Sequence, residues 1–307
     1  MTIDRFFSFS DFESTSRAVL TFLHSRLGFE LWMVTRTEGD DWIVLQSEDH
    51  GYGVKEGDVF RWADSFCSQM VRGLGPCIAP KSGLIPAYAS APIGEQVDIG
   101  AYVGVPLSDA DGSLFGTLCA IDPNEQPDSL QAELPLIELL GKMLSCLLVA
   151  ELKLLSHQRR TERSLSRDAL DLETGLMNQL GWDSIVQAEE RRCRIYGHSA
   201  CVVTIALTDS PSNGNQEAGA TLATHIHQTL KECLGPNDSM ARIAPQLFAI
   251  MGPERNLEHG NSLAKRIVAA LSSTGVAAYV GIATRDPRTG MRAAFEKSKE
   301  SAFAQTQ

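Results

Sequence analysis

One stretch, residues 99–123, decides the fold of the first half of this chain, and it reads IGAYVGVPLSDADGSLFGTLCAIDP. Two apolar runs, Gly100–Leu107 and Leu114–Ile121, are separated by Asp109-Ala110-Asp111-Gly112, whose residue types are typical of a tight turn. This spacing predicts an antiparallel hairpin.

Upstream of this stretch, short apolar runs alternate with turn residues, which predicts a mixed helix and strand domain. The expected elements are a helix over Phe12–Leu27, strands over Leu31–Thr37, Trp42–Gln46 and Val59–Trp62, a helix over Ala63–Arg72 and a loop or irregular helix over Lys81–Val97. Ser and Asp residues before Phe12 are suited to cap the first helix.

A long helix is expected over residues 134–170. Its apolar residues alternate four and three positions apart, as in a heptad repeat, and they are Leu136, Leu140, Met143, Leu147, Ala150 and Leu154. This repeat favours a parallel homodimer through residues 134–155 over an amphipathic helix that packs only on its own domain. The arginine-rich end of the helix, Arg159-Arg160-Thr-Glu-Arg163, is expected to be solvated.

The second half alternates helices and strands, which suits a central sheet flanked by helices. The expected elements are helices over Gly181–Tyr196, Ala220–Leu234 and Leu263–Leu271, strands over Ala200–Leu207 and Ala277–Ala283, a hairpin around Ala244-Pro245, a polar loop over Thr208–Glu217 and a final helix. The fold class is therefore α/β (α+β), with one domain over 1–155 and a second over 171–307.

The composition restricts the partners. The 307 residues carry 38 acidic and 27 basic residues, a net charge of −11, and residues 1–155 hold 22 of the acids and 10 of the bases. A net acidic surface argues against nucleic-acid binding. No secretory signal and no membrane span are visible. The seven cysteines form no C-x-x-C pair, so a reduced, cytoplasmic protein without a metal site is expected.

The hairpin over 99–123 resembles the paired central strands of GAF domains, the small-molecule and protein-interaction modules of bacterial sensors. The resemblance covers most of residues 10–155 but identifies no ligand, so no cofactor is predicted. By the family's geometry six residues should face a central pocket: Trp62, Phe66, Cys67, Tyr88, Tyr102 and Cys119. The plainer interpretation of these side chains is core packing. Redox activity at Cys67 and Cys119 is a weaker alternative, because no His or Lys is adjacent to either in sequence.

The second half is similar to GGDEF domains, which condense two GTP molecules into cyclic di-GMP. Three segments carry the resemblance: Asp171-Leu-Glu-Thr-Gly-Leu-Met-Asn178 matches the family's opening motif, Arg191–Gly197 its first-helix ending, and Gly275-Val-Ala-Ala-Tyr-Val-Gly-Ile-Ala283 its late strand. The family's chemistry needs divalent metal ions held by carboxylates beside the nucleotide phosphates.

The resemblance implies that those carboxylates have been lost. The signature's place is taken by Ala244-Pro245-Gln246-Leu247-Phe248, in which Gln246 and Leu247 stand at the acidic positions. The metal-binding aspartate of the first strand falls on Ala206. The product-inhibition motif, Arg-x-x-Asp in the family, reads Gly235-Pro-Asn-Asp238. We therefore expect no catalytic residue, no metal and no cyclase activity.

The leading hypothesis is a non-catalytic signalling protein, in which the first domain senses a ligand or partner and the second binds an unknown signalling protein. One alternative is a residual GTP-binding module or weak diguanylate cyclase that makes cyclic di-GMP from GTP. Another is that residues 171–307 are a structural remnant that only dimerises the sensor.

Overall fold

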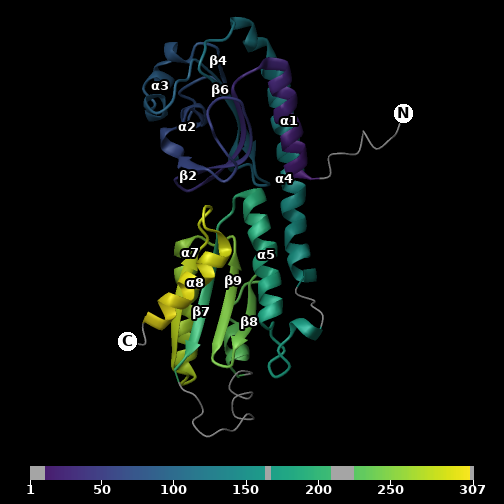
Figure 1. Cartoon of the computed structure of the whole chain (residues 1–307), viewed down its shortest axis with the longest axis vertical. Helices are drawn as coiled ribbons and strands as arrows, with labels where there is room; N and C mark the ends of the chain where they lie inside the picture. Colours follow the sequence, from purple (N-terminus) through teal and green to yellow (C-terminus); the bar gives the residue numbers. More distant parts are fainter. Residues whose placement is uncertain (1–10, 163–166, 209–224, 305–307) are drawn as a thin grey trace, which may run out of the picture. The chain divides into compact units, whose positions relative to one another are not determined.

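A computed structural model describes residues 11–162, 167–208 and 225–304 (Figure 1). The chain divides into two compact units. The first comprises Met1–Leu154 with Ile195–Gly197, and the second comprises Leu155–Arg194 with His198–Gln307.

The first unit is built on an antiparallel sheet of six strands in the order β3-β2-β1-β6-β5-β4. The strands are β1 (Leu31–Glu38), β2 (Asp41–Asp49), β3 (Val59–Arg61), β4 (Ile78–Ala79), β5 (Ala101–Ser108) and β6 (Leu114–Asp122). The hairpin predicted over 99–123 is confirmed, because β5 and β6 pair from Ala101 opposite Asp122 to Ser108 opposite Leu114. β6 also pairs with β1, which places the hairpin inside the sheet.

Helices cover both faces of this sheet. In Figure 1, α1 (Phe12–Leu27) and the start of α4 (Leu134–Glu162) lie on one side of it, and α2 (Phe66–Val71) and α3 (Pro86–Ala89) lie on the other. The predicted start of α1 is confirmed: the Asp11 side chain accepts a hydrogen bond from the Ser14 amide and caps the helix. The Phe12 amide then donates to the Glu151 carboxylate at 2.6 Å, which holds α1 against α4.

The segments expected to be irregular contain short helical turns. The helix predicted over Ala63–Arg72 begins as a 3-10 turn, η2 (Trp62–Asp64), and becomes α2 only at Phe66, after the Ser65 side chain has capped it. The loop predicted over Lys81–Val97 holds η3 (Ser82–Leu84), α3 and η4 (Pro92–Glu95). A further 3-10 turn, η5 (Asp128–Glu133), leads directly into α4.

The long helix α4 is shorter than predicted. It ends at Glu162, residues 163–166 lie outside the described part of the chain, and Arg167–Ala169 form a 3-10 turn, η6. One face of α4 is buried, along Ile137, Leu144 and Leu148, whereas Leu139, Met143 and Leu154 are 54%, 60% and 56% exposed. Within the described residues, no helix is both long enough and apolar enough to cross a membrane.

The second unit is built on a four-stranded antiparallel sheet in the order β10-β7-β9-β8. Its elements are α5 (Gln179–Tyr196), β7 (Ala200–Leu207), β8 (Ser239–Ala244), β9 (Leu247–Pro253), α7 (Leu257–Ser273), β10 (Ala278–Thr284) and α8 (Gly290–Phe303), and residues 225–231 are also helical. The predicted loop over Thr208–Glu217 and the start of the predicted helix over Ala220–Leu234 lie almost entirely outside the described residues.

Alternating residues of β7 supply two separate cores. Val203 and Ile205 face α7, whereas Ala200 and Val202 face α5 and α8. A strand that is buried on both faces is mainly apolar, as β7 is at every position except Thr204. The predicted central sheet flanked by helices is therefore confirmed.

Candidate functional site

The first unit encloses a cavity of about 250 Å³ between the sheet and the segments that carry α2 and η4. Its wall is mainly apolar and consists of Leu31, Met33, Trp42, Tyr52, Gly53, Val54, Asp58, Phe60, Phe66, Cys67, Ile93, Gln96, Val97, Ile99, Cys119 and Ile121. Among these described residues Asp58 carries the only formal charge, and there is no lysine or arginine. The wall therefore suits a small uncharged molecule better than an anion.

Three of the six predicted pocket residues lie on this wall, namely Phe66, Cys67 and Cys119. The other three pack behind or beside it. Tyr88 stacks on Phe66 with ring centroids 4.7 Å apart, and its hydroxyl donates to the Pro76 carbonyl. Trp62 makes an edge contact with Trp42, which does line the cavity. A role in ligand binding for all six stays a prediction.

Tyr102 is fully buried, and its hydroxyl donates to the Cys67 sulfur at 3.3 Å. The Thr117 hydroxyl lies 3.4 Å from the same sulfur and 3.6 Å from the sulfur of Cys119. Thr117 gives no functional signal in the sequence, because a threonine inside an apolar strand does not show what its hydroxyl will contact.

These contacts give the two thiols different pKa values. Burial raises the pKa of Cys67, but hydrogen bonds from Cys119, Thr117 and Tyr102 outweigh it, so the pKa of this thiol lies below its ordinary value. The hydrogen bond that Cys119 donates to Cys67, together with burial, raises the pKa of Cys119 well above its ordinary value. Cys67 therefore ionises before Cys119.

In the second unit, the three positions at which carboxylates are expected to be lost lie together at one end of the sheet. Ala206 of β7 pairs with Leu247 of β9, and the Gln246 carbonyl accepts a hydrogen bond from the Leu207 amide at 2.9 Å. The turn between β8 and β9 is made by Pro245 and Gln246. Residues far apart in sequence thus form one patch, and their side chains offer a metal ion no carboxylate.

The acids of the opening motif are engaged elsewhere. Arg242 of β8 binds Glu173 at 2.5 Å and Asp171 at 3.3 Å. Asp171 also accepts hydrogen bonds from the amide and hydroxyl of Thr174, which close the turn of the motif. These acids hold the motif against β8.

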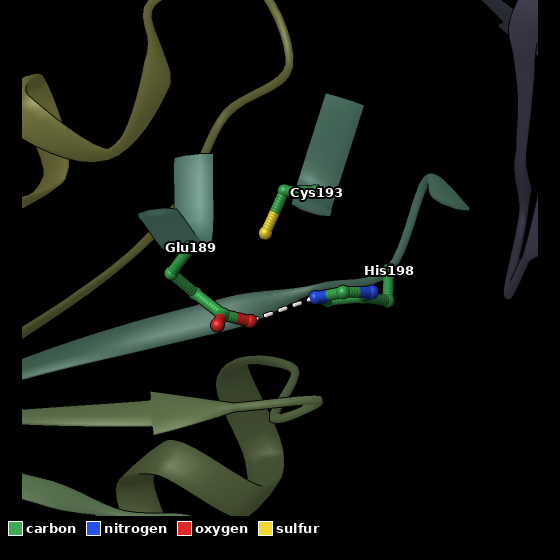
Figure 2. A group of neighbouring side chains, drawn as sticks. All are labelled: Glu189, Cys193 and His198. Carbon is green, nitrogen blue, oxygen red and sulfur yellow. Dashed lines mark hydrogen bonds and ion pairs between the residues drawn. The ribbon is translucent and has the colours of Figure 1, made fainter. Parts of the chain in front are cut away.

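One group of potential metal ligands occurs among the described residues of the chain: Glu189, Cys193 and His198 (Figure 2). The Glu189 carboxylate faces His198, 2.9 Å away, and also binds Arg159 at 2.8 Å and Arg192 at 3.1 Å. Two guanidinium groups therefore already neutralise this carboxylate. Burial raises the pKa of the Cys193 thiol, which disfavours the thiolate that a metal would need. The group does not fit a metal ion, and we interpret it as a buried ion-pair network.

The expectation that the arginine-rich end of α4 is solvated is wrong for Arg159. Its side chain is 5% exposed and binds Glu189 of α5 and Glu254, which follows β9. Arg192 of α5 reaches back to Glu162, the last residue of α4. The last turns of α4 are therefore fixed to the second unit, because leaving a buried guanidinium without a carboxylate would be costly.

Comparison with known families identifies the first unit. The family model described as "GAF domain" matches residues 11–148. This part of the chain is a GAF domain. The cavity, with Cys67 and Cys119 on its wall, lies inside it. A search of curated proteins found no match to the chain.

Solved structures of GGDEF domains are similar to the C-terminal part of the chain. The FimX GGDEF domain from Pseudomonas aeruginosa is 17% identical, with a TM-score of 0.42, and the match covers 46% of this chain and 93% of that one. The coiled coil and GGDEF domain of DgcB from Caulobacter crescentus, in complex with c-di-GMP, is 15% identical, with a TM-score of 0.42, over 58% of this chain and 95% of that one. The diguanylate cyclase SiaD from Pseudomonas aeruginosa, in complex with its activator SiaC, is 17% identical, with a TM-score of 0.43, over 58% of this chain and 75% of that one.

Proposed function

We propose that this chain is a non-catalytic regulator in cyclic di-GMP signalling. Its GAF domain senses a small ligand, and its second unit, a GGDEF-like domain without cyclase activity, binds another signalling protein. The observation that carries the proposal is the patch formed by Ala206, Gln246 and Leu247, whose side chains offer no carboxylate to a metal ion.

The loss of carboxylates at this patch would remove two requirements of phosphoryl transfer at once. Without bound metal the negative charge of the GTP phosphates is not neutralised, and the attacking hydroxyl is not activated. Pro245 in the hairpin also lacks the backbone N–H that a glycine at this position would offer to a phosphate. Asp171 and Glu173 do not replace the missing acids, because both bind Arg242.

Incubation of the purified full chain with magnesium and GTP tests the proposal. We expect no cyclic di-GMP by chromatography and no heat of GTP binding by calorimetry, with an active diguanylate cyclase as the positive control. The matched variant combines Ala206→Asp, Gln246→Asp and Leu247→Glu, and magnesium-dependent GTP binding by this variant alone would support the assignment of the lost site. Product from the unaltered chain would contradict the proposal, and binding without turnover would favour a GTP-responsive module.

We further propose that α4 forms a parallel homodimer. The apolar residues left exposed on α4 include Met143 and Leu154 of the heptad repeat, with Leu139 beside them. A heptad repeat is self-complementary, so a second copy of the same helix buries this face in register. An unpartnered apolar stripe of this length on a soluble helix is otherwise unfavourable.

The double variant Met143→Glu with Leu154→Glu should dissociate the dimer. Like charges would then face each other across the seam, and we expect the dissociation constant to rise at least about hundredfold, or ~3 kcal/mol. Analytical ultracentrifugation measures the change, and the exposed Gln158→Glu is the control for adding a negative charge to α4 outside the heptad positions. A monomeric unaltered protein at micromolar concentration would contradict the dimer, as would a double variant that remains dimeric.

A further inference from the structure

Two thiols from different elements meet at the cavity of the GAF domain. Cys67 lies in α2 and Cys119 lies in β6, and both line the cavity. Each is 1% exposed, and neither is in a disulfide. The Thr117 hydroxyl lies 3.4 Å from the sulfur of Cys67 and 3.6 Å from the sulfur of Cys119, so one hydroxyl group contacts both sulfur atoms.

Two hydroxyl groups lie close to the sulfur of Cys67, whereas only one of them, that of Thr117, lies close to the sulfur of Cys119. The Tyr102 and Thr117 hydroxyls lie 3.3 and 3.4 Å from the sulfur of Cys67. A side chain at Gly104 would prevent the first contact, because a Cβ there would lie 1.9 Å from the Tyr102 hydroxyl oxygen. Together with the Cys119 thiol, these groups provide the stabilisation that a thiolate needs in a site without a basic residue on its wall.

The cavity gives the thiols access to small molecules. Gly53 and Gln96 belong to its wall and are exposed at the surface, so the cavity reaches solvent. A volume of about 250 Å³ admits a small uncharged oxidant, and the apolar wall does not repel one. The buried Cys193 and Cys201 of the second unit have pKa values that are raised by burial, and neither lies on the wall of this cavity.

We propose that Cys67 and Cys119 form a reversible dithiol–disulfide pair that is oxidised by a hydroperoxide entering the cavity. The Cys67 thiolate attacks the terminal peroxide oxygen, the O–O bond breaks, and the alkoxide or hydroxide leaves with a proton. The Cys119 sulfur then attacks the sulfenic acid at Cys67, the S–O bond breaks and water leaves. In total the two thiols lose two electrons and two protons, and the peroxide takes up these electrons and protons.

A disulfide at this place would tie α2 to the central strand β6 and alter the wall of the cavity. A role for this disulfide as an input to signalling rests on the proposed sensor function of the GAF domain. Formation of the disulfide itself does not rest on that function, so the redox pair and the sensor function can fail separately. Tyr102 and Thr117 are positioning residues in this scheme, because they act on the sulfur and not on the peroxide.

Treatment of the full-length chain with hydrogen peroxide at mildly alkaline pH tests the proposal. Peptide mapping after alkylation should find a peptide that links Cys67 to Cys119, with the mass of two hydrogens lost, and dithiothreitol should restore both thiols. In Cys119→Ser, dimedone should trap a sulfenic acid at Cys67, whereas Cys67→Ser should leave Cys119 reduced. The exposed Cys146→Ser is the matched control and should form the link as the unaltered chain does.

A second pair of variants tests the positioning residues. Thr117→Val and Tyr102→Phe should each slow formation of the link about tenfold at neutral pH, as a rise of one unit in the pKa of Cys67 would do. The rates should converge with that of the unaltered chain as the pH rises, which a loss of folding would not produce. Oxidation of Cys146 while Cys67 and Cys119 stay reduced would overturn the proposal. A link that forms without changing dimerisation would leave the redox pair in place and exclude it as the sensor's input.

Discussion

Glu189→Gln should lower the free energy of unfolding of the second unit by about 3–5 kcal/mol, the usual range when one member of a buried ion pair is removed. Glu189 is 2% exposed and is the shared partner of Arg159 and Arg192, each 5% exposed. Without the carboxylate charge, Arg159 keeps its ion pair with Glu254 and Arg192 keeps its ion pair with Glu162, but both lose their shared buried partner. Hydrogen exchange on peptides from β7 and β9 during urea unfolding would measure the loss.

The control for this experiment is Glu296→Gln on α8. Glu296 is 56% exposed and pairs with Lys299, so its neutralisation should change stability by about 1 kcal/mol or less. Equal effects of the two substitutions would show that the network around Glu189 does not stabilise the fold.

The difference in stability between the unaltered chain and Glu189→Gln should become smaller at low pH. Burial raises the pKa of Glu189, but hydrogen bonds from His198 and Arg159 bring it down to about 2, below the value of 4.5 for an ordinary glutamate. A carboxyl group whose pKa is depressed in the folded state stabilises the fold at pH values above its unfolded-state pKa. This contribution is lost as the pH falls from about 5 towards 2. The gap between the unaltered chain and Glu189→Gln should therefore narrow by about 3 kcal/mol over that window.

Gly116→Ala should destabilise the GAF domain by about 3 kcal/mol, near the upper end of what overpacking costs. A Cβ at this position would lie 1.8 Å from the carbonyl oxygen of Thr35 and 2.6 Å from its carbonyl carbon. Both atoms belong to the backbone of β1, just after its irregular step between Val34 and Thr35, so no side-chain rotation relieves the clash. The strand β1 would have to move away from β6.

Urea unfolding followed by tryptophan fluorescence measures this effect, because Trp32 is buried in β1 close to the clash. The matched control is Gly83→Ala, where a Cβ would meet no atom within 4 Å, so a change of less than about 1 kcal/mol is expected. A Gly116→Ala protein as stable as the control would mean that β1 and β6 leave room between them for a methyl group at position 116.

The elements that were predicted well depend on local patterns. The sequence predicts the helix Phe12–Leu27 and the strand Ala200–Leu207 at their observed bounds, because a capping side chain marks the first and a mainly apolar run between turn residues marks the second. The hairpin over 99–123 was found for the same reason, since its turn residues lie beside the strands that they join.

The features that were missed depend on partners distant in sequence. Arg159 was expected to be solvated because nothing near it in sequence shows that Glu189, thirty residues later, will neutralise it. The roles of Thr117 and Gly104 in the candidate redox site cannot be read from the sequence for the same reason. Thr117 acts on Cys67 and Gly104 leaves space for Tyr102, and only the fold brings these residues together. Periodicity locates a buried face, but it does not show which polar atoms on that face will meet.

The attachment of Arg159 has a consequence for exchanging modules between proteins of this kind. α4 starts in the first unit, and its residues from Leu155 onward belong to the second, where Arg159 is held by Glu189 and Glu254. A chimera that fuses a different N-terminal domain to this second unit should therefore be joined before Leu155, at a matching heptad position. The segment 155–162 then remains with the carboxylates that neutralise it, and a foreign helix grafted across that segment would have to supply its own guanidinium at position 159.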